Sequence, residues 1–245
     1  MDGNNMITAK RLSELLAAER MPKEGPFLAV KSLFETENAE ALYNEATKEN
    51  ATAEAKAKWG AYTLKLHQAL DAYLTQIENS PEKPAKEVLA DIREAYAVNS
   101  HLCADALAAE PEGTVQLMVN AAYEDLAKFD RYTAENAAEY EAGLAKLLYL
   151  GKLKYELENV HGNEEEMKAW KAEILTELMS GTFAENAAKY KDSEIVKETV
   201  AKLRKNPGMD PETAIQSAIV GIAEENYSSD IRLTEHKIFT LKNSA

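Results

Sequence analysis

The sequence has few of the residues that form disulfides or tight turns. Its 245 residues include one cysteine, Cys103, together with ten glycines and seven prolines. A single thiol cannot form an intramolecular disulfide, so a reducing compartment, the cytoplasm, is the simplest expectation. So little glycine and proline argues against a β fold, which needs many turns. These shortages leave a helical, disulfide-free protein as the expected class.

Long apolar runs are also missing. No stretch approaches the ~20 apolar residues that cross a bilayer. The first residues, MDGNNMITAKRLSELL, lack the basic segment and apolar run of a secretory signal. We therefore expect neither a membrane span nor a signal sequence. Hydrophobic residues make up 45% and charged residues 29% of the chain. This balance is typical of a folded protein with a sizeable core.

Positive charge is the scarcer sign. The 28 lysines and arginines are outnumbered by 42 acidic residues, which gives a formal net charge of −14. A field of this sign repels phosphate backbones and anionic membranes. The best basic cluster, Lys202, Arg204 and Lys205, is expected in the last turn of a helix, where it suits the helix dipole. We predict no direct nucleic-acid binding, and we interpret the acidity as serving solubility or a basic protein partner.

Nearly every segment with a clear hydrophobic period has helical spacing. The sequence therefore predicts an all-α fold: an antiparallel multi-helix bundle of long amphipathic helices with a few short connecting helices. We expect a single domain over 1–245. A subdivision near residue 162, into a long-helix bundle (1–161) and a smaller helical subdomain (162–245), is the alternative. The expected helices are 8–20, 26–34, 37–49, 51–77, one from Pro84, 115–129, 134–160, one from Asn163, 183–190, 194–205 and one from Pro211.

Three of these helices carry apolar stripes that predict their packing. The segment 134–160 has two apolar faces, so neighbours should cover it on both sides. In 51–77 the stripe is Trp59, Tyr62, Leu66, Leu70, Tyr73 and Ile77. After Pro84 a nearly heptad stripe predicts shallow packing on a neighbouring helix, with Asn99 setting the register and Cys103 buried as a small apolar side chain. Its members are Ala85, Leu89, Ile92, Tyr96, Asn99, Cys103 and Ala106.

Helix ends can also be predicted from local signals. Thr114 is expected to cap 115–129, and Asp210 to cap the helix that opens with Pro211. The helix from Asn163 is expected to end at Gly181 and to bury Met167, Trp170, Ile174 and Leu178. The similar octapeptides TAENAAEY (133–140) and FAENAAKY (183–190) are interpreted as recurring helix starts, with an internal duplication as the alternative. The tail, 228–245, fits either two strands or, as we prefer, a helix.

The stretch ELENVHGNEEE contains the one candidate metal site. Glu158 and His161 have the Glu-x-x-His spacing of a carboxylate-bridged metal centre. The other histidines, His67, His101 and His236, have no glutamate three residues before them. A two-metal carboxylate site needs further glutamates from facing helices and usually a second such pair. Glu158 and His161 are therefore metal-ligand candidates without the rest of the pattern.

The same stretch is also explained by two helix ends, which is the interpretation we prefer. His161 would lie in the last turn of one helix, where a cation suits the dipole, and Gly162 could take a left-handed exit. Asn163 would cap the next helix and Glu166 would complete a capping box. On this interpretation the stretch is a corner between helices and not a metal centre.

No phosphate-binding glycine loop, zinc motif, calcium loop or nucleophile elbow is present. We therefore predict a non-enzymatic interaction protein that has no cofactor. It would be an adaptor or inhibitor that binds a basic protein, for example by occupying that protein's nucleic-acid-binding groove. One alternative is a ferritin-like metal protein built on Glu158 and His161. The other is a helical enzyme or small-ligand carrier with an inter-helix pocket. Its candidate lining residues are Tyr96, Asn99, Tyr140, Tyr149 and Tyr155.

Overall fold

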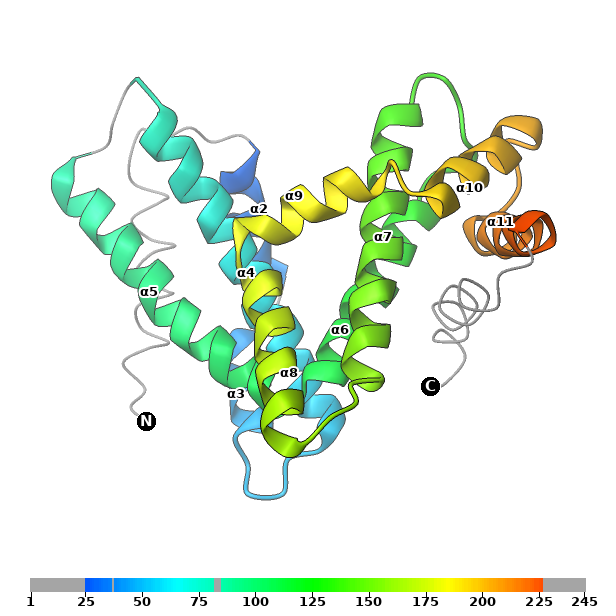
Figure 1. Cartoon of the computed structure of the whole chain (residues 1–245). Helices are drawn as coiled ribbons and strands as arrows, with labels where there is room; N and C mark the ends of the chain where they lie inside the picture. Colours follow the sequence, from blue (N-terminus) through cyan, green and yellow to red (C-terminus); the bar gives the residue numbers. More distant parts are fainter. Residues whose placement is uncertain (1–24, 37, 82–84, 227–245) are drawn as a thin grey trace. The chain divides into compact units, whose positions relative to one another are not determined.

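The computed structural model describes residues 25–36, 38–81 and 85–226, and this part of the chain contains helices and no strand (Figure 1). The predicted all-α fold of packed long and short helices is confirmed. In the same residues, every helix is too short or too polar to pass through a lipid bilayer. The predicted helix at 8–20 and the tail at 228–245 lie outside the described residues. The helices are α2 (Pro26–Thr36), α3 (Ala39–Ala46), α4 (Ala53–Asn79), α5 (Lys86–Ala109), α6 (Pro111–Ala127), α7 (Ala137–Glu158), α8 (Glu164–Met179), α9 (Gly181–Tyr190), α10 (Glu194–Lys205) and α11 (Pro211–Asn226).

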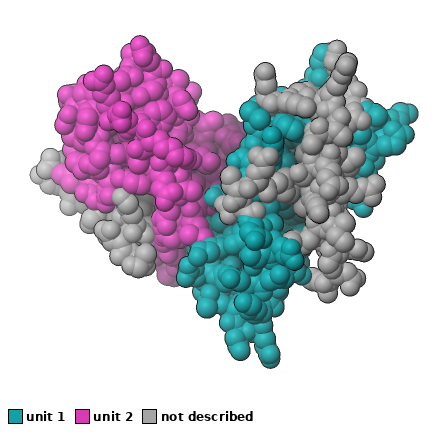
Figure 2. Space-filling view, turned by 180° about the vertical axis from the view of Figure 1, so that it is seen from behind, with its two compact units in different colours: residues 1–114, 175–181 teal, residues 115–174, 182–245 magenta. Residues whose placement is uncertain are grey.

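The chain divides into two compact units (Figure 2). Unit 1 comprises residues 1–114 and 175–181, and unit 2 comprises residues 115–174 and 182–245. Each boundary falls inside a helix, namely α6, α8 or α9, and not in a linker. Compactness shows where contacts concentrate, but it does not show whether a part folds alone. The predicted single domain, and the alternative subdivision near residue 162, therefore stay predictions.

Helix α4 forms the core of unit 1, where it packs against α2, α3 and α5. Its start is fixed by Thr52, whose Oγ1 accepts a hydrogen bond from Ala55 N at 3.1 Å. Burying each large apolar side chain of its stripe stabilises the fold by about 1.5–3 kcal/mol. The predicted stripe is confirmed, because all six members are buried: Trp59, Tyr62, Leu66, Leu70, Tyr73 and Ile77.

Helices α4 and α5 run antiparallel, as three hydrogen bonds between them show. Residue numbers fall along α4 as they rise along α5, which is the order of an antiparallel pair. The bundle prediction required such pairing of consecutive long helices. The bonded pairs are Glu78 with Arg93, Asp71 with Tyr96 and Thr63 with Asn99.

The buried face of α5 follows the prediction in part. The helix begins at Lys86 and not at Pro84, and Val88 and Ala95 are more fully buried than their neighbours Leu89 and Tyr96. The buried residues advance by steps that average about 3.6 residues, the repeat of a straight helix, whereas a heptad stripe requires 3.5. The prediction is confirmed for Ile92, Asn99, Cys103 and Ala106, which are buried. It also holds for Leu89 and Tyr96, which are partly buried and pack against the core, and it is wrong for Ala85, which is exposed.

Helix α7 is buried on two faces, as predicted. In unit 2 it packs against α10, which in turn packs against α11. Aromatic rings anchor its first turns, since Tyr140 lies 5.5 Å from Phe129 and 5.6 Å from Tyr132 between ring centroids. The buried residues are Tyr140, Leu144, Leu147 and Leu148 on one face and Leu150, Leu153 and Leu157 on the other.

The start of α11 also confirms its prediction. Pro211 is the first helical residue, and Asp210 Oδ1 accepts a hydrogen bond from Thr213 N at 3.0 Å. The hydrogen bond from the Thr213 hydroxyl, and secondly that from Thr213 N, hold the pKa of Asp210 below its usual value. The predicted buried face, Ile215, Ile219 and Ile222, is buried.

Three further predicted helix boundaries are wrong. Helix α6 begins at Pro111, so Thr114 is not its cap, and Thr114 Oγ1 instead donates to Glu110 O at 2.6 Å. Proline is preorganised for the first helical position, and here it sets the start. Gly181 opens α9 and does not close α8. The octapeptide at 183–190 consequently lies inside α9 and is not a helix start.

Candidate functional site

Helix α7 ends before the candidate metal ligand His161. Its last residue is Glu158, and the Asn159 backbone N–H donates to Tyr155 O at 3.0 Å. Asn159 Nδ2 donates to the same carbonyl at 2.8 Å. These two bonds close the helix, so His161 lies outside it and is exposed. The prediction that His161 occupies the final turn is wrong.

The residues after His161 form the helix start that the sequence predicted. Glu166 N donates to Asn163 Oδ1 at 3.0 Å, and Asn163 N donates to Glu166 Oε2 at 3.0 Å, which is a reciprocal capping box. Gly162 has a φ of 149°, a conformation that favours glycine. A Cβ at this position would lie 2.8 Å from Glu166 Oε2. The predicted helix start at Asn163 and Glu166 is confirmed. Gly162 is not the exit of α7, because that helix already ends at Glu158.

Glu158, the other candidate ligand, has a structural partner. Its Oε1 accepts a hydrogen bond from Lys154 Nζ at 2.6 Å, and the Lys154 side chain is only 7% exposed. A buried ammonium group needs such a carboxylate, because removing one partner leaves an uncompensated charge. Among the described residues, no three or more His, Cys, Asp or Glu side chains gather in a way that could hold a metal ion. A metal at Glu158 and His161 therefore stays a hypothesis.

A buried histidine, His67, binds the end of α8 within unit 1. His67 lies on α4, and its Nε2 is 2.9 Å from Met179 O. The neighbouring Gln68 Nε2 donates to Leu178 O at 3.0 Å. The last carbonyls of a helix have no partner inside it, so α4 supplies the missing donors. Sequence reasoning missed this role, because the partner of His67 lies 112 residues away.

The surroundings of the His67 imidazole favour its neutral form. Because the Met179 carbonyl can only accept, the proton is on Nε2. Burial lowers the pKa of His67, while the Met179 hydrogen bond and the nearby Asp71 charge oppose that shift. Its Nδ1 is buried with no hydrogen-bond partner among the described residues. The ring thus offers one acceptor that no described residue uses.

Two further polar groups surround His67. The Tyr96 ring stacks on it, with centroids 4.8 Å apart and planes at 24°, and the Tyr96 hydroxyl donates to Asp71 Oδ1 at 3.2 Å. Burial, and secondly the Asp71 charge, raise the pKa of Tyr96. A raised pKa keeps the hydroxyl protonated as a donor. The cluster links α4, α5 and the end of α8, although His67 Nδ1 within it has no hydrogen-bond partner among the described residues.

The candidate pocket residues are buried or half-buried side chains in this structure. Asn99 Nδ2 donates to Thr63 O at 3.2 Å, which agrees with the predicted register role. Burial raises the pKa of Cys103 to about 12, so its thiol stays protonated, as expected of a small apolar side chain. Tyr96 and Asn99 belong to unit 1, whereas Tyr140, Tyr149 and Tyr155 belong to unit 2. The pocket that would join them stays a prediction.

The first turns of α8 carry an exposed aromatic and acidic surface, here called the α8 face and defined as Glu166, Trp170 and Glu173. Trp170 is 48% exposed, although its stripe predicted burial. The period of the stripe is right, since Ile174 and Leu178 are buried. It is the N-terminal part of α8 that the core does not cover, because residues 164–166 and 168–170 are all exposed.

No protein-family model, curated protein sequence or solved structure gives a significant match to this chain.

Proposed function

We propose that this chain is a non-enzymatic, acidic helical interaction protein, an adaptor or inhibitor that binds a basic protein surface. The observation that carries the proposal is that the buried and the exposed polar groups have different roles. Two buried polar side chains, His67 and Asn99, each bond to another helix, whereas the acidic side chains of the α8 face stand exposed beside a tryptophan. Binding another macromolecule uses such a surface, and it needs no catalytic group.

The acidity of both units supports this proposal. Unit 1 has 20 acidic and 12 basic residues, for a net charge of −8, and unit 2 has 22 and 16, for −6. An acidic surface repels nucleic acid and anionic lipid, and it attracts a basic protein over distances of about one Debye length. We therefore propose a basic partner, for example a nucleic-acid-binding protein, in the predicted cytoplasmic location.

The structural roles of the internal ionisable groups also support a non-enzymatic function. Lys154 is paired with Glu158, and the imidazole of His67 is bound to a helix end. Burial raises the pKa of the Cys103 thiol to about 12, so the thiol keeps its proton. Catalytic groups usually need pKa values near the working pH and a partner for proton transfer. Lys154 and His67 have instead the partners of structural residues.

A capture experiment from the native host tests the proposal. The purified chain is immobilised, and bound proteins are identified by mass spectrometry at low salt and at about 0.5 M salt. We expect a basic protein that binds at low salt and is released at high salt, and that binds again when purified separately. Retention of only neutral or acidic proteins, or of nothing at either salt concentration, would contradict the proposal.

A further inference from the structure

The α8 face lies on one side of its helix. Steps of four and three residues separate Glu166, Trp170 and Glu173, and residues at these spacings are neighbours on a helix surface. The lysines nearest to Trp170, Lys168 and Lys171, are two and one positions away and so point in other directions. The face therefore combines one aromatic ring with two carboxylates and contains no positive charge.

Trp170 is an exposed apolar side chain of the kind that anchors interfaces. Among the described residues, the large hydrophobic side chains that are exposed are Leu28, Trp170 and Val220. Tryptophan is strongly enriched among residues that dominate binding energy, whereas leucine and valine are under-represented there. Trp170 also has a carboxylate on each side of it along the helix. These two carboxylates favour a positively charged group over the Trp170 ring.

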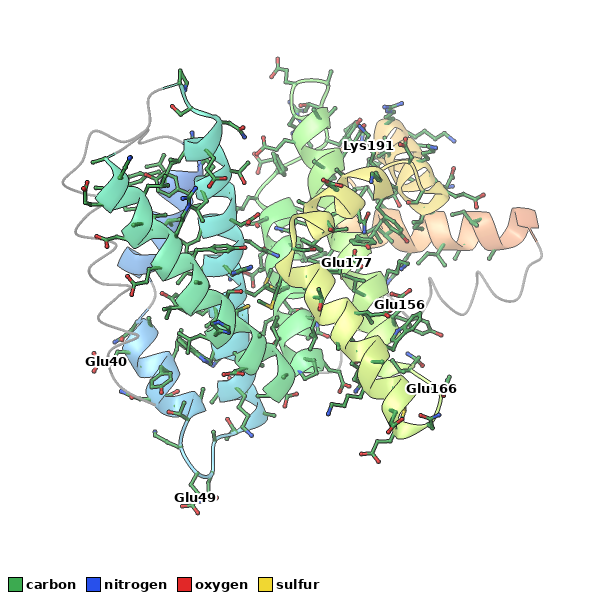
Figure 3. The ribbon with its side chains drawn as sticks, turned by 60° about the vertical axis from the view of Figure 1, so that its left-hand side comes forward. Glu40, Glu49, Glu156, Glu166, Glu177 and Lys191 are labelled. Carbon is green, nitrogen blue, oxygen red and sulfur yellow. The ribbon has the colours of Figure 1, made fainter. Side chains whose placement is uncertain are left out.

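Unit 2 itself shows how a ring and a carboxylate hold a cation on a helix surface. On α7, Lys152 Nζ lies 5.6 Å from the centroid of the Tyr149 ring and 2.7 Å from Glu156 Oε1. Figure 3 labels Glu156 on α7 and Glu166 at the start of α8. The lysine is three residues after Tyr149, but the residue three after Trp170 is Glu173. The α8 face thus has the ring and the carboxylates of this arrangement without its own cation.

We propose that the α8 face docks an arginine- or lysine-rich segment of a partner protein, with one cation over Trp170 and paired to Glu173 or Glu166. This inference rests on the proposed function, because it names where the basic partner binds. Arginine suits the site better than lysine, since its planar guanidinium stacks on a ring and pairs with a carboxylate at the same time. An apolar partner would remove water from two carboxylates and give them no partner in return, which costs free energy. Nucleic acid is negatively charged and would be repelled by the same carboxylates.

The test measures binding of three synthetic peptides to the full chain: an arginine-rich peptide, its lysine counterpart and an apolar amphipathic helix. Intrinsic fluorescence reports directly, because Trp170 is 48% exposed and the other tryptophan, Trp59, only 8%. Calorimetry covers the variant that lacks Trp170. The variants are Trp170→Ala and Glu173→Gln. Their matched controls in the same unit are Val220→Ala, an equally exposed apolar side chain, and Glu135→Gln, an exposed carboxylate.

We expect the arginine-rich peptide to bind most tightly to the unaltered chain. Trp170→Ala should weaken that binding about tenfold and abolish the preference for arginine over lysine, and Glu173→Gln should weaken it about threefold. Both controls should stay within about twofold of the unaltered chain. Because all four positions are exposed, thermal unfolding should confirm that each variant is folded.

Other results would overturn the inference in distinguishable ways. If Trp170→Ala binds the arginine-rich peptide as tightly as Val220→Ala does, the basic partner binds elsewhere, and the proposed function stands without this site. Preferential binding of the apolar peptide, or self-association that Trp170→Ala abolishes, assigns the face to an apolar partner or to a second copy of the chain. If the unaltered chain binds neither the basic peptides nor a basic host protein, the proposed function fails together with the site.

Discussion

His67 on α4 and Met179 at the end of α8 are joined by a 2.9 Å hydrogen bond between the imidazole Nε2 and the main-chain carbonyl. A side chain of one helix therefore completes the hydrogen bonding of another helix's last turn. Gln68 does the same for Leu178. Such a bond matters because a buried carbonyl without a donor costs about 1–3 kcal/mol.

Replacing His67 should therefore destabilise the protein. We expect His67→Ala to lower the free energy of unfolding by about 2–4 kcal/mol, from the lost hydrogen bond, the lost stacking on Tyr96 and the cavity left behind. His101→Ala is the control, because His101 is exposed on α5, and it should change stability by less than ~0.5 kcal/mol. Urea denaturation measures both. Equal effects would show that the Met179 contact contributes nothing.

The same residue should make stability depend on pH with a definite sign. Burial holds the pKa of His67 in the folded protein below the ordinary value of 6.5. The unfolded chain therefore takes up a proton at this residue first as the pH falls, and stability declines below pH 6.5 until the folded pKa is passed. The stability difference between the unaltered chain and His67→Ala should be largest above pH 6.5 and shrink below it. Denaturation curves across this range would refute the prediction if the difference stayed constant or grew in acid.

Gly162 should be intolerant of a side chain. With φ at 149° and a Cβ 2.8 Å from Glu166 Oε2, alanine would strain the backbone and disturb the capping box. We expect Gly162→Ala to cost about 1–3 kcal/mol of unfolding free energy. The matched change Gly208→Ala meets nothing within 4 Å and should cost less than ~1 kcal/mol. Thermal unfolding of the two variants compares them, and a tolerated Gly162→Ala would show that the corner rearranges easily.

The Lys154–Glu158 pair separates a structural role of Glu158 from a metal-binding one. Glu158→Gln should destabilise the protein by about 2–4 kcal/mol, because it leaves a nearly buried ammonium group unpaired. Glu156→Gln provides the control, since Glu156 makes the same i,i+4 pair with Lys152, whose side chain is 36% exposed. This change should cost less than ~1 kcal/mol.

Adding a chelator to the unaltered chain gives the other half of this test. If Glu158 serves only Lys154, the melting temperature should not change when the chelator is added. A fall in melting temperature with chelator, reversed by iron or manganese, would support the ferritin-like alternative through Glu158 and His161.

Local signals in the sequence predicted the helices well, because each depends on neighbouring residues. The spacing of Trp59 through Ile77 predicted six buried side chains of α4, and Asn163 with Glu166 forms the predicted capping box. Asp210 and Pro211 mark the start of α11 in the same way. Pro111 and Thr114 are both signals for the start of α6. The sequence did not show which of the two is the stronger signal.

The candidate site depends on contacts between residues far apart in the sequence, which local signals cannot predict. The role of His67 follows from a partner 112 residues away, so its sequence context gave no hint of it. Periodicity placed Trp170 in line with Ile174 and Leu178, but it could not show how far along α8 the covering core extends. The exposure of Trp170, on which the proposed docking depends, therefore emerged only from the folded chain.

The measurement that tests the central claim most directly is the affinity of the chain for its purified basic host partner across a series of salt concentrations. An acidic surface that recognises a basic one predicts that the dissociation constant rises at least tenfold between low salt and about 0.5 M salt. A dissociation constant that stays unchanged across this range would contradict the claim that charge selects the partner.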